Sequence, residues 1–407
     1  MPLRHRLACA ALSAAALAAA APSPAAALSA DAVRQRLAQL APGLGGASGA
    51  YVVDLDDAGD EVLFRRREDV ARIPASNEKL FTTAAALLRF GPNATLDTTL
   101  HVPEGVAVDD EGVLRSDVFL VGAGDPSLDD RDLRGLAQQL RDAGVQRITG
   151  GVVGDETLFD ARRGGPRTGF AADRDMGGWL SALAWGHGRA YPGGNPAVVA
   201  ANRLQLFLKQ AGIKVGRKGR AGSLGDLPGT QVASVPSPPI RQLAAITNQP
   251  SDNFYAETLL KGLGARFGDA GTTGAGLAVV RAQLASFGIH PRLADGSGLS
   301  RANRVTPRQL VRLLDRMAGQ EIAGAWDASL ARFGQTGTLA KRLRGTQAAR
   351  SCRGKTGTIN GVSALSGYCT SRDGGLVAFS FLSNGVWPTG AKRVEDRMVR
   401  VIANFDG

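Results

Sequence analysis

The sequence predicts a mixed α/β fold of the α+β type, in which a five-stranded antiparallel sheet is flanked by helices and carries a smaller, β-rich inserted domain. Strand-like runs lie near both ends of the chain, and helical patterns fill most of the space between them. One long stretch in between has a different texture. Because the strands come from both ends, we expect sequence-distant segments to close one sheet.

The strands are predicted from runs of β-branched and aromatic residues bounded by turn residues. Two form a hairpin near the N-terminus and three follow one another near the C-terminus: 48–55, 61–65, 352–359, 363–370 and 376–383.

Helices are predicted where apolar residues recur at helical spacing. The helix at 76–90 is apolar on nearly every side, so we expect it to be buried, and Gly91-Pro92 ends it. The others are expected at 31–40, after the N-cap Ser29, and at 239–247, 251–263, 273–287, 307–317 and 391–404.

Residues 96–235 alternate short strand-like runs with Gly, Asp and Pro turns, and they contain one clear helix, 132–143. The Gly-rich, basic stretch 216–229 is typical of a loop or return linker. A single core seldom holds a chain of this length, so two domains are expected. We assign 28–95 and 236–407 to the main domain and 96–235 to the insert.

The N-terminus has the pattern of a secretory signal peptide. Arg4-His5-Arg6 precede an apolar run at 7–21, and small residues at 25–27 offer a cleavage site. The alternative, a membrane anchor, is disfavoured because the run is shorter than about 18 residues and prolines follow it. We therefore predict cleavage of residues 1–27, export to the periplasm or the extracellular cell-wall space, and no membrane span afterwards.

The formal net charge of +11 favours acidic surroundings such as cell-wall polymers. Nucleic acid is not an expected partner, because the arginines are scattered and no binding motif accompanies them. The four histidines lie far apart, without metal-ligand spacing, so we expect neither a metal nor another cofactor.

Three short motifs occur in order: Ser76-Asn77-Glu78-Lys79, Ser251-Asp252-Asn253 and Lys355-Thr356-Gly357-Thr358. Each alone is weak evidence. Together, each on a suitable element, they match the SxxK, SxN and KTG signature of serine acyl-transfer enzymes that react with penicillin.

Ser76 and Lys79 lie one helical turn apart, so both side chains project into one cleft. A serine hydroxyl becomes a good nucleophile only when a base removes its proton. Lys79 can serve as that base if its pKa is depressed, either by burial or by a second cation, for which Lys355 is the candidate. A capping serine beside a solvated lysine is the alternative, which the other two motifs disfavour.

Ser251 is expected to relay a proton to the leaving nitrogen, and Asn253 to hold the substrate backbone; helix capping is the alternative role of Ser251. On the third motif, Gly357 lets a substrate lie close to the strand. The hydroxyls of Thr356 and Thr358, with Lys355, can bind a carboxylate. The N–H groups of Thr358 and Ser76 can form an oxyanion hole. The similar stretch 335–338 lacks the lysine and is predicted to be a loop.

The chain resembles the low-molecular-mass class C penicillin-binding proteins, which are D-alanyl-D-alanine carboxypeptidases and endopeptidases of the S13 peptidase family. Besides the three motifs, the resemblance rests on Pro74–Thr83, Gly122–Leu128, Gly154-Asp155 with Phe159, Asp295–Arg301 and Gly367-Tyr368. It implies a penicillin-recognising, serine transpeptidase-like domain with an insert. It also implies hydrolysis of peptidoglycan stem peptides ending in D-Ala-D-Ala through an acyl-enzyme at Ser76, which β-lactam antibiotics also acylate.

The resemblance further implies a specificity pocket for a stem peptide with a zwitterionic diamino acid. Arg301 would pair with its carboxylate, Asp155 with its amine and Phe159 with its stem, with Asn360 nearby. Alternatively, Arg301 braces its own loop and Asp155 caps a turn. The separation of Ser76 and Ser251, 175 positions, is short for this family, which implies a trimmed insert.

Two other functions stay open: a β-lactamase, and a catalytically idle protein that binds the cell wall or senses penicillin. The large insert argues against a compact class A β-lactamase, and the intact catalytic residue types argue against an idle protein.

Asn360-Gly361 is a strong signal for a two-residue hairpin turn. With this loop, residues whose numbers sum to 721 lie opposite each other, which pairs Cys352 with Cys369 at a non-hydrogen-bonded position. The short Cα separation there suits a disulfide, as does an exported protein. Reduced cysteines in the core, or a register shifted by a bulge, are the alternatives.

Overall fold

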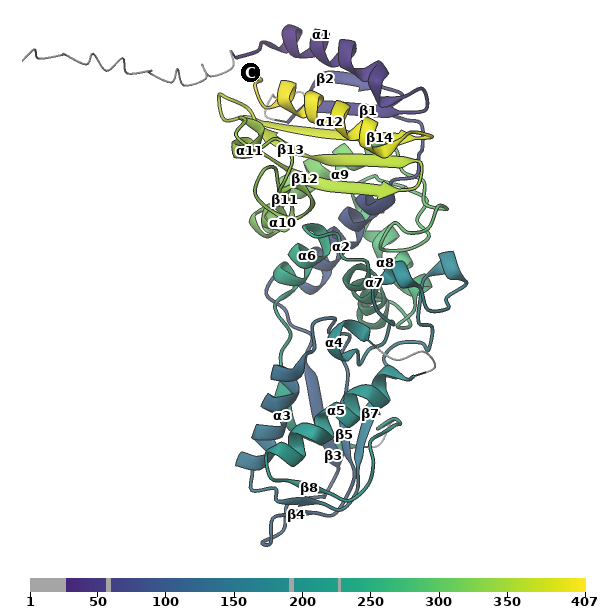
Figure 1. Cartoon of the computed structure of the whole chain (residues 1–407), viewed down its shortest axis with the longest axis vertical. Coiled ribbons are helices and arrows are strands. Elements are labelled where there is room, and N and C mark those ends of the chain that lie inside the picture. Colours follow the sequence, from purple (N-terminus) through teal and green to yellow (C-terminus); the bar gives the residue numbers. More distant parts are fainter. Residues whose placement is uncertain (1–26, 56–59, 190–193, 226–227) are drawn as a thin grey trace, which may run out of the picture.

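The computed structural model describes residues 27–55, 60–189, 194–225 and 228–407. The predicted signal peptide therefore lies outside the described residues, apart from its last position. The molecule is elongated, with a large sheet at one end, a group of helices in the middle and a second sheet system at the other end (Figure 1).

The main sheet is antiparallel and has the order β11-β12-β13-β14-β1-β2. Because N-terminal β1 pairs with β14, the two ends of the chain close one sheet, as predicted. The sheet has six strands and not five, since the two-residue β11 is too short to leave a sequence pattern. The strands are β1 (Gly49–Asp54), β2 (Glu61–Arg66), β11 (Ala331–Arg332), β12 (Cys352–Ile359), β13 (Val362–Thr370) and β14 (Leu376–Asn384).

Helices cover both faces of this sheet. Successive side chains of a strand point to opposite faces, so β14 contributes to two apolar clusters, one on each face. Phe379 and Phe381 belong to the apolar cluster formed with α1 (Ala30–Leu40) and α12 (Pro388–Ile402). Ala378 and Leu382 belong to the cluster on the other side. That side holds α2 (Lys79–Phe90), α6 (Ile240–Asn248), α7 (Asn253–Phe267), α8 (Thr273–Ser286), α9 (Pro307–Ala318) and α10 (Ala323–Ser329).

The start of α2 differs from the prediction. Residues Ala75–Glu78 form a 3₁₀ turn, η2, and the α-helix begins only at Lys79. The helix is buried on nearly all sides, as its composition predicted, and Gly91 ends it with a φ of +86°. The other predicted helices of the main domain lie within a few residues of their expected positions.

The insert is less β-rich than predicted, because two long helices, α3 (Asp130–Asp142) and α5 (Pro196–Gln210), pack in its core. The sequence analysis missed α5, although Asn195 caps it and Pro196 opens it, a typical start signal. Its larger sheet has the order β10-β3-β5-β7-β9, in which β5, β7 and β9 run parallel. These strands are β3 (Thr98–Pro103), β5 (Val118–Val121), β7 (Val152–Asp155), β9 (Arg220–Ala221) and β10 (Gly229–Val235), beside a small parallel sheet of β4 (Val113–Leu114), β6 (Arg147–Ile148) and β8 (Lys214–Val215).

The apolar core of the insert draws its buried residues from the interval between Leu100 and Ala233. The stretch 216–229, predicted to be a loop, contributes β9. In the part of the chain that is described, no helix is long and apolar enough to cross a bilayer.

Candidate active site

The three motifs converge where η2, the start of α7 and β12 meet. The Lys79 ammonium lies 3.1 Å from Ser76 Oγ, 2.6 Å from Asn253 Oδ1 and 2.6 Å from the Ser297 carbonyl oxygen. The Lys355 ammonium lies 2.7 Å from Ser251 Oγ. Each predicted catalytic side chain therefore contacts another one from the set.

Close backbone contacts hold the turn of Ser76 against its neighbours. Asn77 Nδ2 donates to the carbonyl of Lys355 at 3.0 Å, which ties η2 to β12. A Cβ at Gly357 would lie 2.7 Å from the carbonyl oxygen of Pro74, so only glycine lets strand and turn come this close. Gly357 thus serves contact with the nucleophile turn, in addition to the expected access for substrate.

Two residues next to the reacting groups adopt left-handed backbone conformations that side chains disfavour. Ala75, just before the nucleophile, has a φ of +46°, and Ser251 has a φ of +70°. Such strain persists only when surrounding contacts hold the backbone in place, and it is common at functional sites.

Burial is the main cause that lowers the pKa of Lys79 to about 8, while the charges of Asp295 and Glu257 oppose it. Burial, and next the charge of Lys79, holds the pKa of Lys355 well below its usual range. Repulsion between the two ammonium groups is mutual, and here it lowers the pKa of Lys355, while burial is the leading cause of the lowered pKa of Lys79.

A group of buried carboxyls lies next to Lys79 and was not found from the sequence. Glu257 Oε1 accepts hydrogen bonds from the backbone N–H groups of Gly296 and Ser297, which orients the loop whose Ser297 carbonyl contacts Lys79. Burial raises the pKa of Glu257 to about 7 and that of Glu78 well above its usual range. The spacing of Glu257, four residues after Asn253 on one helix face, is the signal that could have revealed it.

The register of the β12–β13 hairpin directs the N–H of Thr358 away from β13. Ile359 and Val362 flank the two-residue loop and form a hydrogen-bonded pair, and bonded and non-bonded pairs alternate from there. Thr358, opposite Ser363, falls at a non-bonded position. Since β11 pairs only with residues 353 and 354, no strand among the described residues covers the edge at Thr358.

Thr356 contacts Thr338, which belongs to the stretch 335–338 that resembles the third motif. Its hydroxyl lies 2.7 Å from that of Thr338. Thr338 belongs to a 3₁₀ turn, η5 (Gly337–Leu339), in the stretch predicted to be a loop. Its backbone N–H donates to the carbonyl of Gln249 at 2.9 Å, so this turn links β12 to the segment just before the second motif.

Of the four residues expected in a specificity pocket, two lie together. Arg301 Nη1 donates to the carbonyl of Asn360 at 2.8 Å, so the guanidinium contacts the turn of the β12–β13 hairpin.

Asp155 and Phe159 do not lie with this pair. The Asp155 carboxylate accepts hydrogen bonds from the N–H and hydroxyl of Thr157 and the N–H of Leu224, which is the turn-capping alternative. Asp155 lines a cavity of about 920 Å³ whose lining includes no residue of the three motifs. Phe159 is only 5% exposed and packs against Gly124.

A different acidic residue of the insert lies beside the second motif. The Asp175 carbonyl oxygen accepts a hydrogen bond from Asn253 Nδ2 at 2.6 Å. Its carboxylate is 64% exposed and lies 2.7 Å from Arg167. Nothing in the sequence pattern placed Asp175 near the site, because the contact joins two segments 78 residues apart.

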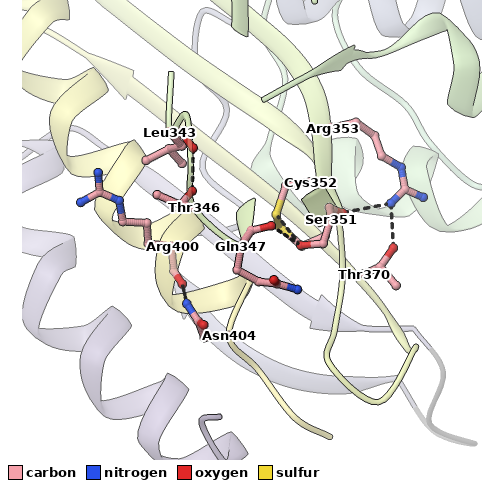
Figure 2. Close-up of a disulfide and its surroundings, with 10 residues drawn as sticks. Leu343, Thr346, Gln347, Ser351, Cys352, Arg353, Thr370, Arg400 and Asn404 are labelled. Carbon is pink, nitrogen blue, oxygen red and sulfur yellow. Dashed lines mark hydrogen bonds between the residues drawn. A yellow bond between two sulfur atoms is a disulfide. The ribbon is translucent and has the colours of Figure 1, made fainter. Parts of the chain in front are cut away.

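The predicted hairpin register is confirmed, since every observed pair from Cys352–Cys369 to Ile359–Val362 sums to 721. The structure contains the predicted disulfide between Cys352 and Cys369, with a Cα separation of 4.1 Å. Figure 2 shows Cys352 between Ser351 and Arg353. The Ser351 hydroxyl lies 3.6 Å from the Cys352 sulfur, and Arg353 donates to Thr370 Oγ1 across the hairpin. The bridge links the outer end of β12, which carries the third motif, to that of its hairpin partner β13.

Over the ranges that the structure describes, no cluster of three His, Cys, Asp or Glu side chains could hold a metal ion.

Ser76 lies in η2 next to the buried Lys79 at the start of α2, beside a sheet that is flanked by helices. Together with the second and third motifs, this arrangement defines the class of serine acyl-transfer enzymes with the penicillin-recognising fold. The model of the D-Ala-D-Ala carboxypeptidase 3 (S13) family matches residues 29–183 and 184–405. The chain belongs to this family.

Curated relatives and solved structures agree with this assignment. The chain is 31% identical to a D-alanyl-D-alanine carboxypeptidase of Actinomadura sp. (strain R39), over 90% of this chain and 83% of that protein. It is 31% identical to the carboxypeptidase DacB of Mycolicibacterium smegmatis, over 83% and 77% of the two chains. The structure of penicillin binding protein 4 from Haemophilus influenzae matches with a TM-score of 0.74 at 21% identity, covering 89% of this chain and 97% of that one.

Proposed function

We propose that this protein is a serine D,D-carboxypeptidase that removes the terminal D-Ala of peptidoglycan stem peptides through an acyl-enzyme at Ser76. The observation that carries this proposal is the 3.1 Å contact between Lys79 Nζ and Ser76 Oγ at a fully buried lysine. Because the pKa of Lys79 is about 8, about one tenth of the molecules hold it neutral at pH 7, ready to accept the serine proton.

In this mechanism, Lys79 takes the proton of Ser76 Oγ, which attacks the carbonyl carbon of the penultimate D-Ala. The N–H groups of Thr358 and Ser76 stabilise the oxyanion. Ser251, held by Lys355, delivers a proton to the nitrogen of the departing D-Ala and receives in return the proton that Lys79 accepted from Ser76, so that Lys79 is neutral again. Water then hydrolyses the ester bond, and Ser76 regains its proton.

The relatives support both this reaction and its antibiotic sensitivity. Two of them are named as carboxypeptidases, and penicillin binding protein 4 of Haemophilus influenzae has been solved in complex with a β-lactam. We propose that β-lactams acylate Ser76, that the substrate is peptidoglycan, and that the protein acts outside the cytoplasmic membrane.

The same site suits a second substrate, the D-amino-acid cross-link between two stem peptides. A fold neighbour with a TM-score of 0.58 is described as a predatory peptidoglycan endopeptidase of Bdellovibrio bacteriovorus. At 16% identity, this similarity shows only a shared fold. A cross-linked dimer peptide should therefore be assayed beside the D-Ala-D-Ala peptide.

The deciding experiment compares the wild type and Ser76→Ala with a fluorescent penicillin and a D-Ala-D-Ala peptide. The wild type should be labelled covalently and release D-Ala, and Ser76→Ala should do neither while keeping its melting temperature. Ser127→Ala, which removes a hydroxyl from the insert, is the matched control. Rapid turnover of the antibiotic would instead indicate a β-lactamase, and labelling without peptide cleavage would indicate a sensor.

For peptides with a zwitterionic diamino acid, we propose Asp175 as the acidic contact in place of Asp155, with Arg301 on the carboxylate. The Asp175 side chain is exposed, pairs with Arg167 and belongs to the residue whose backbone carbonyl contacts Asn253, whereas the buried Asp155 carboxylate is occupied by its own turn. Asp175→Asn should raise KM several-fold for a diaminopimelate peptide and leave KM unchanged for a plain D-Ala-D-Ala peptide. Asp155→Asn is the matched control, and an equal effect of both variants would contradict the assignment.

A further inference from the structure

One residue of the insert reaches into the second motif. His187 lies in α4 (Trp185–Gly188), a short turn in which it adopts a φ of +63°. Its ring lies 4.5 Å from the ring of Phe254 and 5.7 Å from that of Tyr255, measured between centroids. These contacts fix the plane of the imidazole, so its two nitrogens point at defined partners.

The two partners belong to the segments that hold Asn253. Nε2 lies 2.9 Å from Asp252 Oδ2, and Asp252 stands between Ser251 and Asn253. Nδ1 lies 3.2 Å from the carbonyl oxygen of Gly177, two residues after the Asp175 carbonyl that Asn253 contacts. The other Asp252 oxygen accepts from the N–H of Tyr255 and caps α7. The imidazole therefore links the Ser251–Asn253 loop, which faces Lys355 and Lys79, to the segment of the insert at Gly177.

Both partners of the ring are acceptors: one is a carboxylate and the other a backbone carbonyl. A neutral imidazole has one N–H and can donate to only one of them, whereas an imidazolium donates to both. We propose that His187 is a positioning residue for the second motif, and that only its protonated ring clamps the Ser251–Asn253 loop to the segment that follows Asp175.

The charges around the ring agree with this inference. The hydrogen bond to Asp252 raises the pKa of His187, and burial and the charge of Arg189 oppose that rise. Tyr255 is the titratable group whose ring faces the imidazole, and the neighbouring 3₁₀ turn η4 (Arg174–Met176) carries Arg174 and Asp175.

The clamp also affects the base. The negative charge of Asp252 raises the pKa of Lys79, and an imidazolium next to Asp252 offsets that charge. When pH rises through the pKa of His187, one hydrogen bond of the clamp is lost and the Asp252 charge is no longer compensated. Both changes disfavour acylation, so they work against the gain from deprotonating Lys79.

The test measures the acylation rate constant and the apparent binding constant of a fluorescent penicillin from pH 5.5 to 10, for wild type and His187→Gln. Glutamine can donate to Asp252 but cannot carry a charge. We expect it to slow acylation about tenfold at pH 6 and by a factor that shrinks towards one at pH 9 and above. His101→Gln, a histidine of β3 that contacts Thr99, should match the wild type throughout.

A second variant and a direct measurement complete the test. Asp252→Asn keeps the oxygen that caps α7, and it should remove the same pH dependence, with no further loss in the double variant. ¹⁵N NMR of the wild-type enzyme at pH 6 should show both ring nitrogens of His187 protonated.

The inference would be overturned by an equal loss in His187→Gln at every pH, which indicates a purely structural role, or by a singly protonated ring at pH 6. The inference rests on the proposed acyl-enzyme at Ser76, but different results would refute the inference and the proposed function. A wild type that penicillin does not label would refute the function, whereas the NMR readout tests the clamp by itself.

Discussion

The cleft of the main domain and the sheet of the insert handle buried polar groups in opposite ways. In the insert, the buried carboxylates of Asp125 and Asp155 are satisfied by the turns that they cap. In the cleft, both oxygens of the buried Glu78 lack a protein partner within the described residues. A group that caps a turn stabilises the fold even where burial raises its own pKa, as it does for Asp125 to about 7, whereas a buried group without a partner costs free energy.

This difference indicates which region carries the chemistry. The apolar core of the insert supports its strands and helices, and ion pairs such as Asp130–Arg203 lie at its surface. The cleft keeps Lys79 and Lys355 fully buried. Buried lysines with lowered pKa values, such as these two, gather at functional sites. We therefore expect substitutions in the cleft to change the reaction rate and substitutions in the insert to change the stability.

The largest expected effect is on chemistry in the cleft. Lys79→Ala should slow acylation by penicillin about 10²- to 10⁴-fold, as the loss of a general base does. Stopped-flow labelling measures the rate constant. Lys261→Met is the matched control: Lys261 is equally buried, but it pairs with Asp160, away from the three motifs. That variant should lower the melting temperature and leave the rate constant of the folded enzyme within about twofold. A comparable rate loss in both variants would contradict the assignment of Lys79.

In the insert, a substitution in the core should lower stability and leave the acylation rate unchanged. Leu136, on α3, is fully buried in its core. Leu136→Ala should lower the free energy of unfolding by about 2–5 kcal/mol, because it removes apolar contacts and leaves a cavity. Urea denaturation measures this loss. Acylation measured well below the unfolding transition should stay at the wild-type rate, and a large rate loss there would remove the distinction between the two regions.

The disulfide belongs to the main domain but lies outside the cleft. Replacing Cys352 and Cys369 by serine should cost about 3 kcal/mol of stability, the value expected for a closed loop of this length. Guanidinium denaturation measures the difference. Because the strand ladder continues to hold the hairpin, peptide hydrolysis at 25 °C should change little. Two free thiols in the unfolded, unreduced wild type would refute the bridge itself.

The smallest expected effect is a shift of the pH profile. Acylation requires neutral Lys79, so the rate should rise with pH through the pKa of about 8. Above its own pKa of about 7, ionised Glu257 opposes that deprotonation, so Glu257→Gln should lower the pKa of Lys79 and speed acylation at pH 7.5 by up to about threefold, the gain in neutral lysine that one pKa unit gives there. The pH dependence of the acylation rate constant measures the shift. A shift of the profile to higher pH would contradict this role of the Glu257 carboxyl. Glu321→Gln, a substitution on the surface, is the control and should leave the profile unchanged.

Much of this protein was determined by its sequence alone. The three motifs, the positions of most main-domain helices and the pairing of Cys352 with Cys369 all follow from local rules. A helix has a fixed period, a two-residue turn sets the register of its strands, and a catalytic motif keeps short spacings. Such rules act between near neighbours, so the printed order of residues is enough to apply them.

The tertiary structure decided what depends on distant segments. It separated Asp155 from Arg301, brought Asp175 and His187 of the insert to the second motif, and set Glu257 beside Lys79. It also assigned the lowered pKa of Lys79 chiefly to burial. The free energy of a charge depends on every group packed around it and on the water that packing removes, and these are fixed only when the chain has folded.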